Sequence, residues 1–214
     1  MERINRELYL NKLINKRENG LIKIITGIRR CGKSYLLDPI YKEYLVNDGV
    51  KEDHIIKLDL DERKNKKYLD PDILDEYVRN LIIDDDIYYL LLDEVQKVED
   101  FESVLNGFLH INNLDIYVTG SNSKFLSSDI ITEFRGRGDE IRIFPLSFKE
   151  FSSVFNGNSD DAWEEYITYG GLPRILSFHT ENEKSIYLKQ LFEKTYLTDI
   201  IERNNIQRVD VLDS

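Results

Sequence analysis

The sequence predicts an α/β protein in which a parallel β-sheet is covered by helices on both faces. Three observations predict this class: five short segments rich in β-branched, aromatic or other apolar residues, helical periodicity between them, and nearly continuous hydrophobicity in several of the five. Strands that alternate with helices form parallel sheets, and strands buried on both faces are apolar throughout. The 214 residues are enough for one domain and a small additional unit.

The first part of the chain supplies all the predicted strands. An amphipathic helix comes first and ends at Asn19-Gly20; its apolar residues recur at helical spacing, at Ile4, Leu8, Leu10, Leu13 and Ile14. Strands are expected at 21–26, 54–60, 87–92, 114–119 and 140–144. Helices are expected between them at 33–47, 71–83 and 99–110. Asp70 is the predicted N-cap of the second of these helices, with Pro71 at its first position.

Pro39 interrupts the predicted helix at 33–47. A proline in a helix interior has no N–H to give to the carbonyl four residues earlier, which here belongs to Tyr35. We therefore expect either a kink at Pro39 or a break at which Asp38 caps a new turn.

After about residue 145 the strand pattern stops. Helices are expected at 148–155, 161–169 and 183–203, with Asn156–Ser159 as a linker and Gly170–Pro173 as a turn. The sequence therefore predicts an α/β core over residues 1–155, which includes an N-terminal helix within 1–19, and a helical subdomain over residues 160–214. The chain stops at Ser214 with neither a helix stop nor a polar tail, which we interpret as an end inside a domain.

Composition and charge narrow the functional classes. The chain has 29 Lys and Arg against 40 Asp and Glu, so its net charge of −11 repels nucleic acids and anionic lipids on average. The single cysteine excludes an internal disulfide, and no Cys/His cluster has zinc-site spacing. The N-terminus is too charged for a signal peptide, and the longest apolar run has six residues, against the ~20 that span a bilayer. We expect a soluble, cytoplasmic protein.

A glycine-rich segment follows the first strand and opens the next helix. Residues 27–34 read G-I-R-R-C-G-K-S, which matches the phosphate-loop pattern G-x-x-x-x-G-K-[ST]. Such a loop turns backbone N–H groups toward phosphates, and the helix N-terminus adds partial positive charge. We expect Lys33 to bind the β- and γ-phosphates and Ser34 to bind Mg²⁺. The other expected nucleotide contacts are Gly27, Ile28, Arg29, Arg30, Cys31, Gly32 and Tyr35. The alternative is a tight strand-to-helix turn with a chance lysine.

Two acids end the third predicted strand. Asp93 is placed to hold Mg²⁺, mostly through water, and Glu94 to orient and polarise an attacking water. The alternative is a strand that ends in solvated acids. Before the same strand, Asp84-Asp85-Asp86 is interpreted as a solvated turn.

Polar residues after the fourth strand are further candidates. Carboxyl ends of parallel strands face the ligand, so Ser121 or Asn122 could sense the γ-phosphate; Thr119-Gly120-Ser121-Asn122 is also a good turn sequence. Arg135 and Arg137 offer guanidinium groups that suit the charge on a transferring phosphoryl group, in their own chain or in a neighbouring subunit. The alternative is that these arginines pair with surface acids.

Cys31 lies inside the predicted phosphate loop. It is either a small residue packed beside the phosphates or a thiol whose oxidation blocks nucleotide entry. The histidines have no partner spacing, and we interpret them as structural: His54, His110 and His179.

In series, these motifs resemble one group of proteins. The combination of G-I-R-R-C-G-K-S, L-L-D-E-V-Q, V-T-G-S-N-S-K-F-L, F-R-G-R-G and I-F-P-L-S-F-K-E-F is similar to prokaryotic AAA-type ATPases, in the archaeal-ATPase-like branch related to the STAND NTPases. The similarity runs from Ile4 to about Ile206. It implies a P-loop NTPase three-layer sandwich with strand order 5-1-4-3-2, ATP binding and slow Mg²⁺-dependent hydrolysis.

The resemblance has two further implications. Gly170–Pro173 is similar to a turn that family members place near the adenine, which implies that Pro173 packs on the base; an ordinary interhelical turn is the alternative. Family members are about twice this length and continue into a winged-helix segment and a C-terminal domain.

Two functional hypotheses remain open. The first is an ATPase that uses Lys33, Glu94 and one of the two arginines, with an arginine acting in trans if the chain forms a homo-oligomer. The second is an ATP-gated switch with little hydrolysis that controls a C-terminal effector domain or a protein partner. A DNA-translocating motor is disfavoured by the charge of −11.

Overall fold

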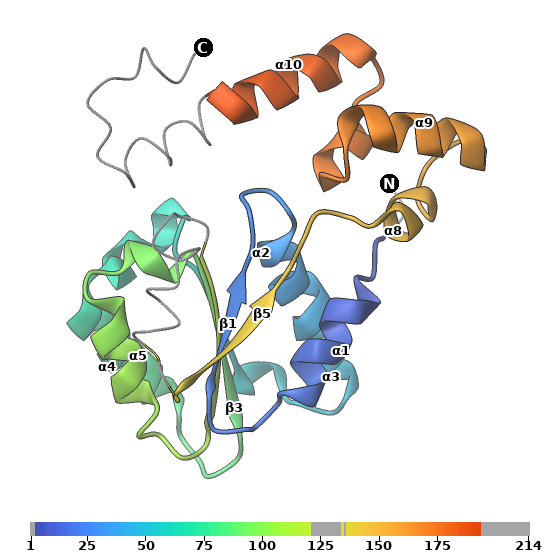
Figure 1. Ribbon diagram of the computed structural model, residues 1–214. Coiled ribbons are helices and arrows are strands. Elements are labelled where there is room, and N and C mark those ends of the chain that lie inside the picture. Colours follow the sequence, from blue (N-terminus) through green and yellow to red (C-terminus); the bar gives the residue numbers. More distant parts are fainter. Residues whose placement is uncertain (1–2, 121–133, 135, 194–214) are drawn as a thin grey trace.

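The computed structural model describes residues 3–120, 134 and 136–193 (Figure 1). In chain order, the helices and strands are α1 (Glu7–Asn15), β1 (Ile22–Thr26), α2 (Lys33–Tyr35), η1 (Leu36–Tyr41), α3 (Lys42–Asn47), η2 (Glu52–His54), β2 (Ile55–Asp59), η3 (Arg63–Leu69), α4 (Pro71–Leu81), β3 (Tyr88–Asp93), η4 (Val95–Lys97), α5 (Phe101–Phe108), β4 (Leu114–Thr119), β5 (Gly138–Arg142), α8 (Phe148–Ser152), α9 (Ser159–Tyr169), η5 (Pro173–Ser177) and α10 (Glu181–Leu191).

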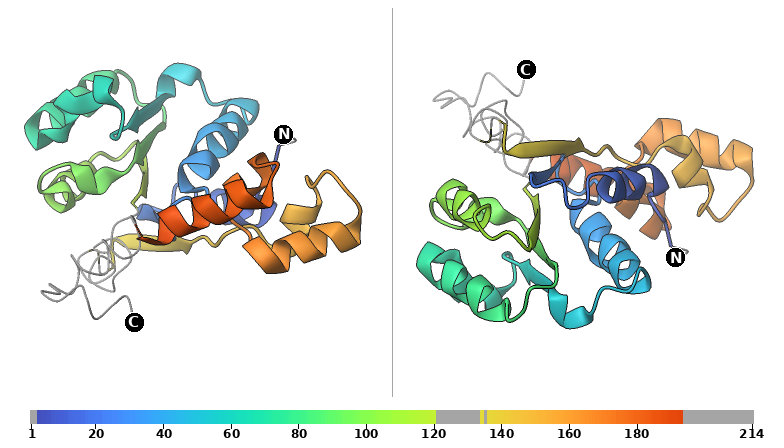
Figure 2. Two further views of the ribbon diagram at one scale, coloured as in Figure 1. Left: turned by 90° about the horizontal axis from the view of Figure 1, so that it is seen from above. Right: turned by 90° about the horizontal axis from the view of Figure 1, so that it is seen from below.

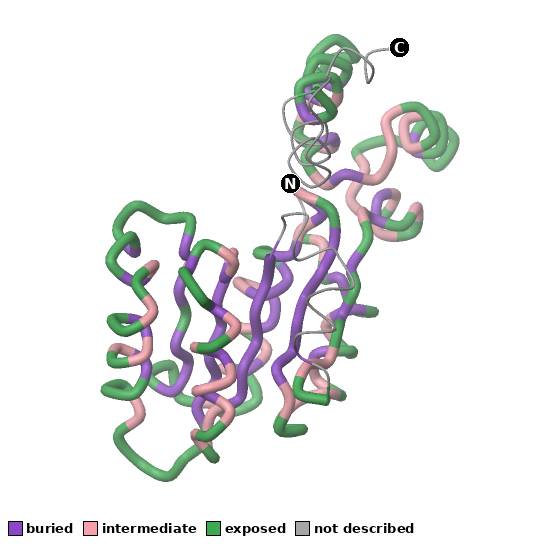
Figure 3. Tube along the Cα trace, turned by 60° about the vertical axis from the view of Figure 1, so that its left-hand side comes forward, coloured by how far each residue is buried: buried purple, intermediate pink, exposed green. Residues whose placement is uncertain are grey.

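The five strands form one parallel sheet in the order β2-β3-β4-β1-β5. Read from the other edge, this is the predicted order 5-1-4-3-2, which is confirmed. Every residue of β1 and β3 is buried, as the purple centre of Figure 3 shows. Burial on both faces explains why these two strands are apolar along nearly their whole length.

Two hydrophobic clusters cover the two faces of the sheet and make the three predicted layers. On one face, α4 and α5 contribute Leu74, Val78, Leu105 and Phe108. On the other face, α1, η1 and α3 contribute Tyr9, Leu13, Leu36, Leu37, Ile40, Tyr41 and Leu45. Figure 2 shows the two sets of helices on opposite sides of the strands. No helix among the described residues is both long and apolar enough to cross a bilayer.

The helix after the glycine-rich segment breaks at the expected place. Asp38 has an extended backbone, with φ −144° and ψ 120°, directly before Pro39. The predicted break is therefore confirmed, but Asp38 does not act as the expected cap: its carboxylate accepts from Lys57 Nζ of β2 at 2.6 Å. Asp70, in contrast, caps α4 as predicted, accepting from the N–H groups of Asp72 and Ile73 at 3.0 and 3.1 Å.

The helices after β5 have a hydrophobic cluster of their own. It joins Leu146, Phe151, Leu172, Ile175, Tyr187 and Leu191, with Ile4 of the N-terminal segment packed against it. Helix α10 begins at Glu181 and is described as far as Leu191, so the later part of the helix expected at 183–203 lies outside the described residues. The boundary expected near residues 155–160 stays a prediction. Leu146 and Phe151 precede that boundary and already belong to this cluster.

Candidate functional site

The glycine-rich segment forms a tight loop from the carboxyl end of β1 into α2. Gly27 has φ +150°, and a Cβ there would lie 2.5 Å from the carbonyl oxygen of Ile143. Gly32 has φ +101° and begins α2. Both positions favour glycine because their φ angles are positive. At Gly27 a side chain would also clash with the backbone of Ile143. The first and last glycines of the motif therefore have physical reasons in the shape of the loop.

Lys33 is buried inside this loop. Its Nζ donates to the carbonyl oxygens of Gly27 and Ile28 at 3.0 and 3.2 Å. Burial lowers the pKa of the Lys33 ammonium, and the negative charges of Asp93 and Glu94 oppose that shift. The loop thus holds a poorly solvated cation that an anionic ligand would stabilise.

Asp93 ends β3 at the same edge of the sheet. Thr119, which ends the neighbouring β4, donates its hydroxyl to the Asp93 carboxylate, and Ser34 hydrogen-bonds the same carboxylate from α2. Burial raises the pKa of Asp93, while these two hydroxyls act in the opposite direction. Three elements that are far apart in the sequence therefore bring three side-chain oxygens to one point.

Glu94 follows Asp93 in the left-handed region, with φ 57° and ψ 46°. For a residue with a Cβ this conformation costs ~1–3 kcal/mol. Its N–H donates to the Thr119 hydroxyl at 3.1 Å, and Gln96 donates its amide to the Glu94 carboxylate. The backbone and the side chain of Glu94 are thus both held beside the loop.

A cavity of ≈ 480 Å³ opens next to the phosphate loop. Its floor is the loop and α2, with Cys31, Gly32 and Tyr35; the other walls are Arg3, Ile4, Arg6, Leu146, Pro173, Arg174 and Ser177. Pro173 lies close to the loop, with its Cγ 3.9 Å from where a Gly32 Cβ would stand. The N-terminal segment, the loop and η5 thus enclose one space, which we call the smaller cavity.

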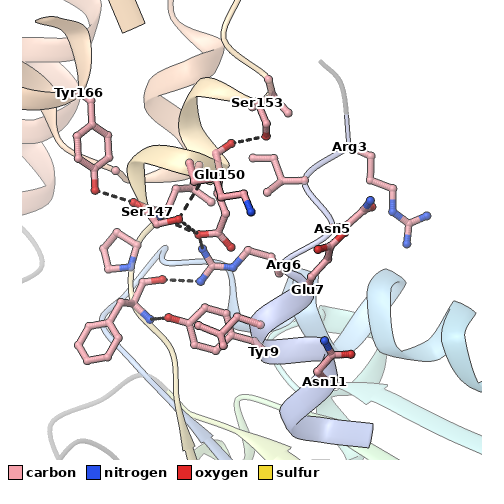
Figure 4. Close-up of a pocket in the computed structure, with 18 residues that line it drawn as sticks. Arg3, Asn5, Arg6, Glu7, Tyr9, Asn11, Ser147, Glu150, Ser153 and Tyr166 are labelled. Carbon is pink, nitrogen blue, oxygen red and sulfur yellow. Dashed lines mark hydrogen bonds and ion pairs between the residues drawn. The ribbon is translucent and has the colours of Figure 1, made fainter. Parts of the chain in front are cut away.

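A larger cavity of ≈ 1030 Å³ lies outside the phosphate loop. It is lined by the N-terminal segment from Arg3 to Asn11 and by the chain that leaves β5 and enters α8 (Figure 4). Arg6 borders both cavities, and in Figure 4 its guanidinium reaches Glu150 and the backbone carbonyl of Phe144.

Cys31 is fully buried in the loop, where burial raises the pKa of its thiol. A buried thiol with a raised pKa holds little of the reactive thiolate. This environment favours the interpretation of Cys31 as a packed residue over that of an oxidation-sensitive thiol.

The predicted arginines lie in different places. Arg30 of the loop has φ 64° and stacks on the ring of Tyr187 in α10, with its Cζ 5.5 Å from the centroid. Arg137 precedes β5 and donates to Asn106 at 2.9 Å. It lies at the amino end of the sheet, so the length of β5, roughly 16 Å, separates it from the phosphate-loop edge. This position does not support a role for Arg137 in its own chain's site. Ser121, Asn122 and Arg135 lie outside the described residues.

The comparisons with known proteins agree with this geometry. Residues 19–152 match the family model of the AAA domain. The chain belongs to this family. The predicted membership among AAA-type ATPases is therefore confirmed, and the family makes the chain a nucleotide-binding, ATPase-like domain.

The relatives of this chain are about twice as long as the chain itself. An uncharacterised protein of Haemophilus influenzae is 34% identical over 217 residues, which cover 99% of this chain and 54% of that protein. An uncharacterised protein of Methanocaldococcus jannaschii is 30% identical over 96% of this chain and 46% of its own length. The chain thus spans about half the length of these curated relatives.

Among solved structures, a DNA polymerase III gamma subunit-related protein from Thermotoga maritima is similar to this chain with a TM-score of 0.51. It covers 93% of this chain and 66% of that chain at 13% identity. At this identity, the likeness concerns the fold alone.

Several residues of the site were not predicted from the sequence. Thr119 was predicted as the end of the fourth strand and the start of a turn, and no role in the site was assigned to it, although its place beside the end of β3 was a usable signal. Gln96 follows the acids by two residues and could have been found as a partner of Glu94. Arg6 and Ile4 offered no local signal of a role in the site, because they meet the smaller cavity only through the tertiary fold.

The oxygen donors near Lys33 fit a magnesium ion. Mg²⁺ prefers oxygen ligands, and the Ser34 hydroxyl and the buried Asp93 carboxylate are already in contact. His54, Asp84 and Asp86 also lie close together, at the opposite end of the sheet. There Lys51 pairs with Asp86 at 2.9 Å and Asp84 accepts from the Asp86 N–H at 3.1 Å, so the predicted exposed turn describes this segment.

Proposed function

We propose that this AAA domain binds ATP together with Mg²⁺ and hydrolyses it to ADP and phosphate. The observation that carries the proposal is the meeting of the phosphate loop with Asp93 and Thr119 at one edge of the sheet. A tight strand-to-helix turn with a chance lysine would need neither a buried ammonium nor a buried carboxylate facing it.

The phosphate loop would hold the triphosphate. In the proposed complex, Lys33 exchanges its two backbone carbonyl partners for oxygens of the β- and γ-phosphates. In the same complex, backbone N–H groups of the loop would donate to the same phosphates, and the start of the helix adds favourable electrostatic potential. Arg29 and Arg30 add positive charge around the loop.

Ser34 and Asp93 would hold the magnesium ion, directly or through water. When bound, the ion neutralises the charge of the phosphates. Thr119 fixes the Asp93 carboxylate from behind, and such outer contacts orient metal ligands.

Glu94 would orient the water that attacks the γ-phosphorus. As the new P–O bond forms, the bond to the β-phosphate oxygen breaks, and the water proton passes toward the Glu94 carboxylate. Gln96 and the Thr119 hydroxyl keep Glu94 in place for this role. We propose Ser121 or Asn122 as contacts of the γ-phosphate, and Arg135 or Arg137 as a group that completes the site of a second copy.

The nucleoside would occupy the smaller cavity. Its volume of ≈ 480 Å³ falls within the ~300–1,000 Å³ typical of small-molecule sites. Apolar surfaces from Ile4, Tyr35, Leu146 and Pro173 suit the faces of a purine ring. This placement supports the implied contact between Pro173 and the base.

Two variants test the proposal by separating binding from hydrolysis. Lys33→Ala should abolish ATP binding in calorimetry at millimolar Mg²⁺, because the loop loses its only lysine. Glu94→Gln should bind ATP as the wild type does and lose most of its phosphate release. Normal hydrolysis by the Glu94 variant would contradict the role of Glu94, and absence of ATP and GTP binding by folded wild-type protein would contradict the whole proposal.

A second candidate function is an ATP-gated switch with little turnover. It is favoured by one observation: the smaller cavity is walled by the α/β layers, the N-terminal segment and η5 together. A nucleotide there would tie these parts to one another and could control a partner or a further domain. Steady-state hydrolysis near zero, with a clear rise in melting temperature on ATP addition, would favour the switch.

A further inference from the structure

We infer that Arg6 is a positioning residue for the nucleoside. It holds the chain segment that is hydrogen-bonded to Gly171–Arg174, which we call the roof of the smaller cavity. The inference rests on the proposed function, because it assigns a role to Arg6 in the binding of the base and sugar of ATP. Arg6 belongs to none of the motifs of the phosphate site.

Arg6 is a buried cation with two hydrogen-bond partners in the segment that leaves β5 and enters α8. Its side chain is 3% exposed. Nη1 donates to Glu150 of α8 at 3.3 Å, and Nη2 donates to the carbonyl oxygen of Phe144. Tyr9 reinforces the contact, because its hydroxyl accepts from the Phe144 N–H at 3.2 Å and its ring lies 4.6 Å below the Arg6 guanidinium. Figure 4 shows these contacts between α1 and the start of α8.

The segment that Arg6 holds is in turn bonded to the roof of the cavity. The Leu146 N–H donates to the carbonyl oxygen of Gly171 at 2.7 Å, and Tyr166 donates its hydroxyl to the Leu146 carbonyl at 2.9 Å. A Cβ on Gly171 would lie 2.2 Å from that same carbonyl oxygen, so glycine is required for the close approach. Pro173 and Arg174, two and three residues further on, line the smaller cavity.

The contacts therefore form one chain: Arg6 holds Phe144 and Glu150, Leu146 holds Gly171, and Gly171 places Pro173. The phosphate loop has supports of its own in β1, α2 and the Lys33 hydrogen bonds. Gly27 and Cys31 of the loop also meet the carbonyl oxygen of Ile143, but Ile143 is fixed without Arg6, because its N–H donates to Thr26 of β1 at 2.8 Å. Loss of Arg6 should loosen the roof and leave the loop intact. It should weaken a ligand that fills both sites and spare a ligand that fills the loop alone.

The experiment compares ATP with inorganic tripolyphosphate, both with Mg²⁺, on Arg6→Met. Methionine keeps much of the apolar volume, and Glu150 keeps its partners in the Ser147 capping box, so the variant is expected to fold. By calorimetry, the affinity for ATP should fall about tenfold or more, and the affinity for tripolyphosphate should stay within about twofold. The KM for ATP should rise while kcat at saturating ATP is retained.

Gly171→Ala distinguishes positioning from direct contact. It leaves Arg6 in place and pushes the roof away from Leu146, so it should reproduce the selective loss of ATP affinity. The double variant should lose no more than the more affected single variant, because both changes act on one contact chain. Lys149→Met is the matched control: it removes a neighbouring positive charge from the larger cavity and should change neither affinity.

Three outcomes would overturn the inference. Arg6→Met could bind ATP as the wild type does, it could lose ATP and tripolyphosphate equally, or Gly171→Ala could bind ATP normally. Failure of the proposed function looks different, because then the wild type itself binds neither ligand.

Discussion

Thr119 has a single hydroxyl that serves both acids of the site. It donates to the Asp93 carboxylate and accepts the Glu94 N–H at 3.1 Å. Thr119 is fully buried, so water cannot replace either bond. At the scale of single residues, the positions of the proposed metal ligand and of the proposed water-orienting acid therefore depend on one side chain of a neighbouring strand.

This dependence predicts the effect of two substitutions at position 119. Thr119→Val keeps the shape and removes the hydroxyl, so the affinity for Mg²⁺ in the presence of ADP should fall by roughly 10- to 100-fold. Thr119→Ser keeps the hydroxyl and should stay close to the wild type. Magnesium titrations of the nucleotide complex, followed by calorimetry, measure both. An unchanged affinity in Thr119→Val, or a loss in Thr119→Ser as large as that in Thr119→Val, would contradict the role assigned to the hydroxyl.

At the scale of elements, a buried tyrosine pair joins η1 to the sheet. Tyr41 donates its hydroxyl to Tyr117 of β4, and Tyr117 donates to Asp115 at 2.8 Å. Asp115 also pairs with the buried ammonium of Lys23 in β1. The pair thus anchors the segment after the phosphate loop to the two central strands, on the side away from α4 and α5.

Burial raises the pKa of both tyrosines above the ordinary value of 10.0. A raised folded-state pKa contributes stability that is fully present below pH 10 and is lost as pH rises beyond it, because the unfolded chain ionises first. Tyr41→Phe should lose about 1 kcal/mol at pH 7 through the missing hydrogen bond. Above pH 10 its free energy of unfolding should fall less steeply than that of the wild type, by up to ~1.4 kcal/mol per pH unit. Urea denaturation across this range measures the difference, and parallel curves would contradict it.

The sequence predicted most elements for physical reasons that are local. Strands buried on both faces are apolar runs, which made β1 and β3 recognisable. Edge strand β5 is half exposed and begins at Gly138, two residues before the expected start, because its pairing with β1 extends beyond its apolar part. Pro39 predicted the break in η1. The ion pair of Asp38 with Lys57 could not be predicted, because it depends on β2, which comes later in the chain.

The candidate site also combines features with a local sequence signal and features that arise only from the tertiary fold. The phosphate loop and the acids of β3 are contiguous motifs, so their positions could be read from sequence. Arg6 and Thr119 act through partners more than 20 residues away. No pattern near Arg6 marks it, and the signal for Thr119 is its place at the end of β4. Arg137 was predicted at the site because of its sequence motif, but the fold places it elsewhere. It directly precedes β5, so it lies at the amino end of the sheet, opposite to the phosphate loop.

For the whole molecule, the smaller cavity joins parts that fold into different clusters. Its walls come from the N-terminal segment, the phosphate loop and η5. Cys31 of the loop belongs to the hydrophobic cluster under α1, η1 and α3. Ile175 of η5 belongs to the cluster of the helices after β5, against which Ile4 of the N-terminal segment packs. A ligand that contacts all three must stabilise them against one another, because openings that separate the walls also release the ligand.

Hydrogen exchange with a non-hydrolysable ATP analogue and Mg²⁺ tests this at the scale of the molecule. At a ligand concentration of about 100 Kd, openings that release the ligand become ~2.7 kcal/mol more costly, which slows exchange roughly 100-fold. Slowing is expected in three separated segments: 3–9, 31–35 and 171–177. The first turn of α4 lies outside the cavity and is expected to exchange by local fraying, so its rate should not change. Protection confined to 31–35 would mean that the nucleotide is held by its phosphates alone and that the two distant walls take no part in binding.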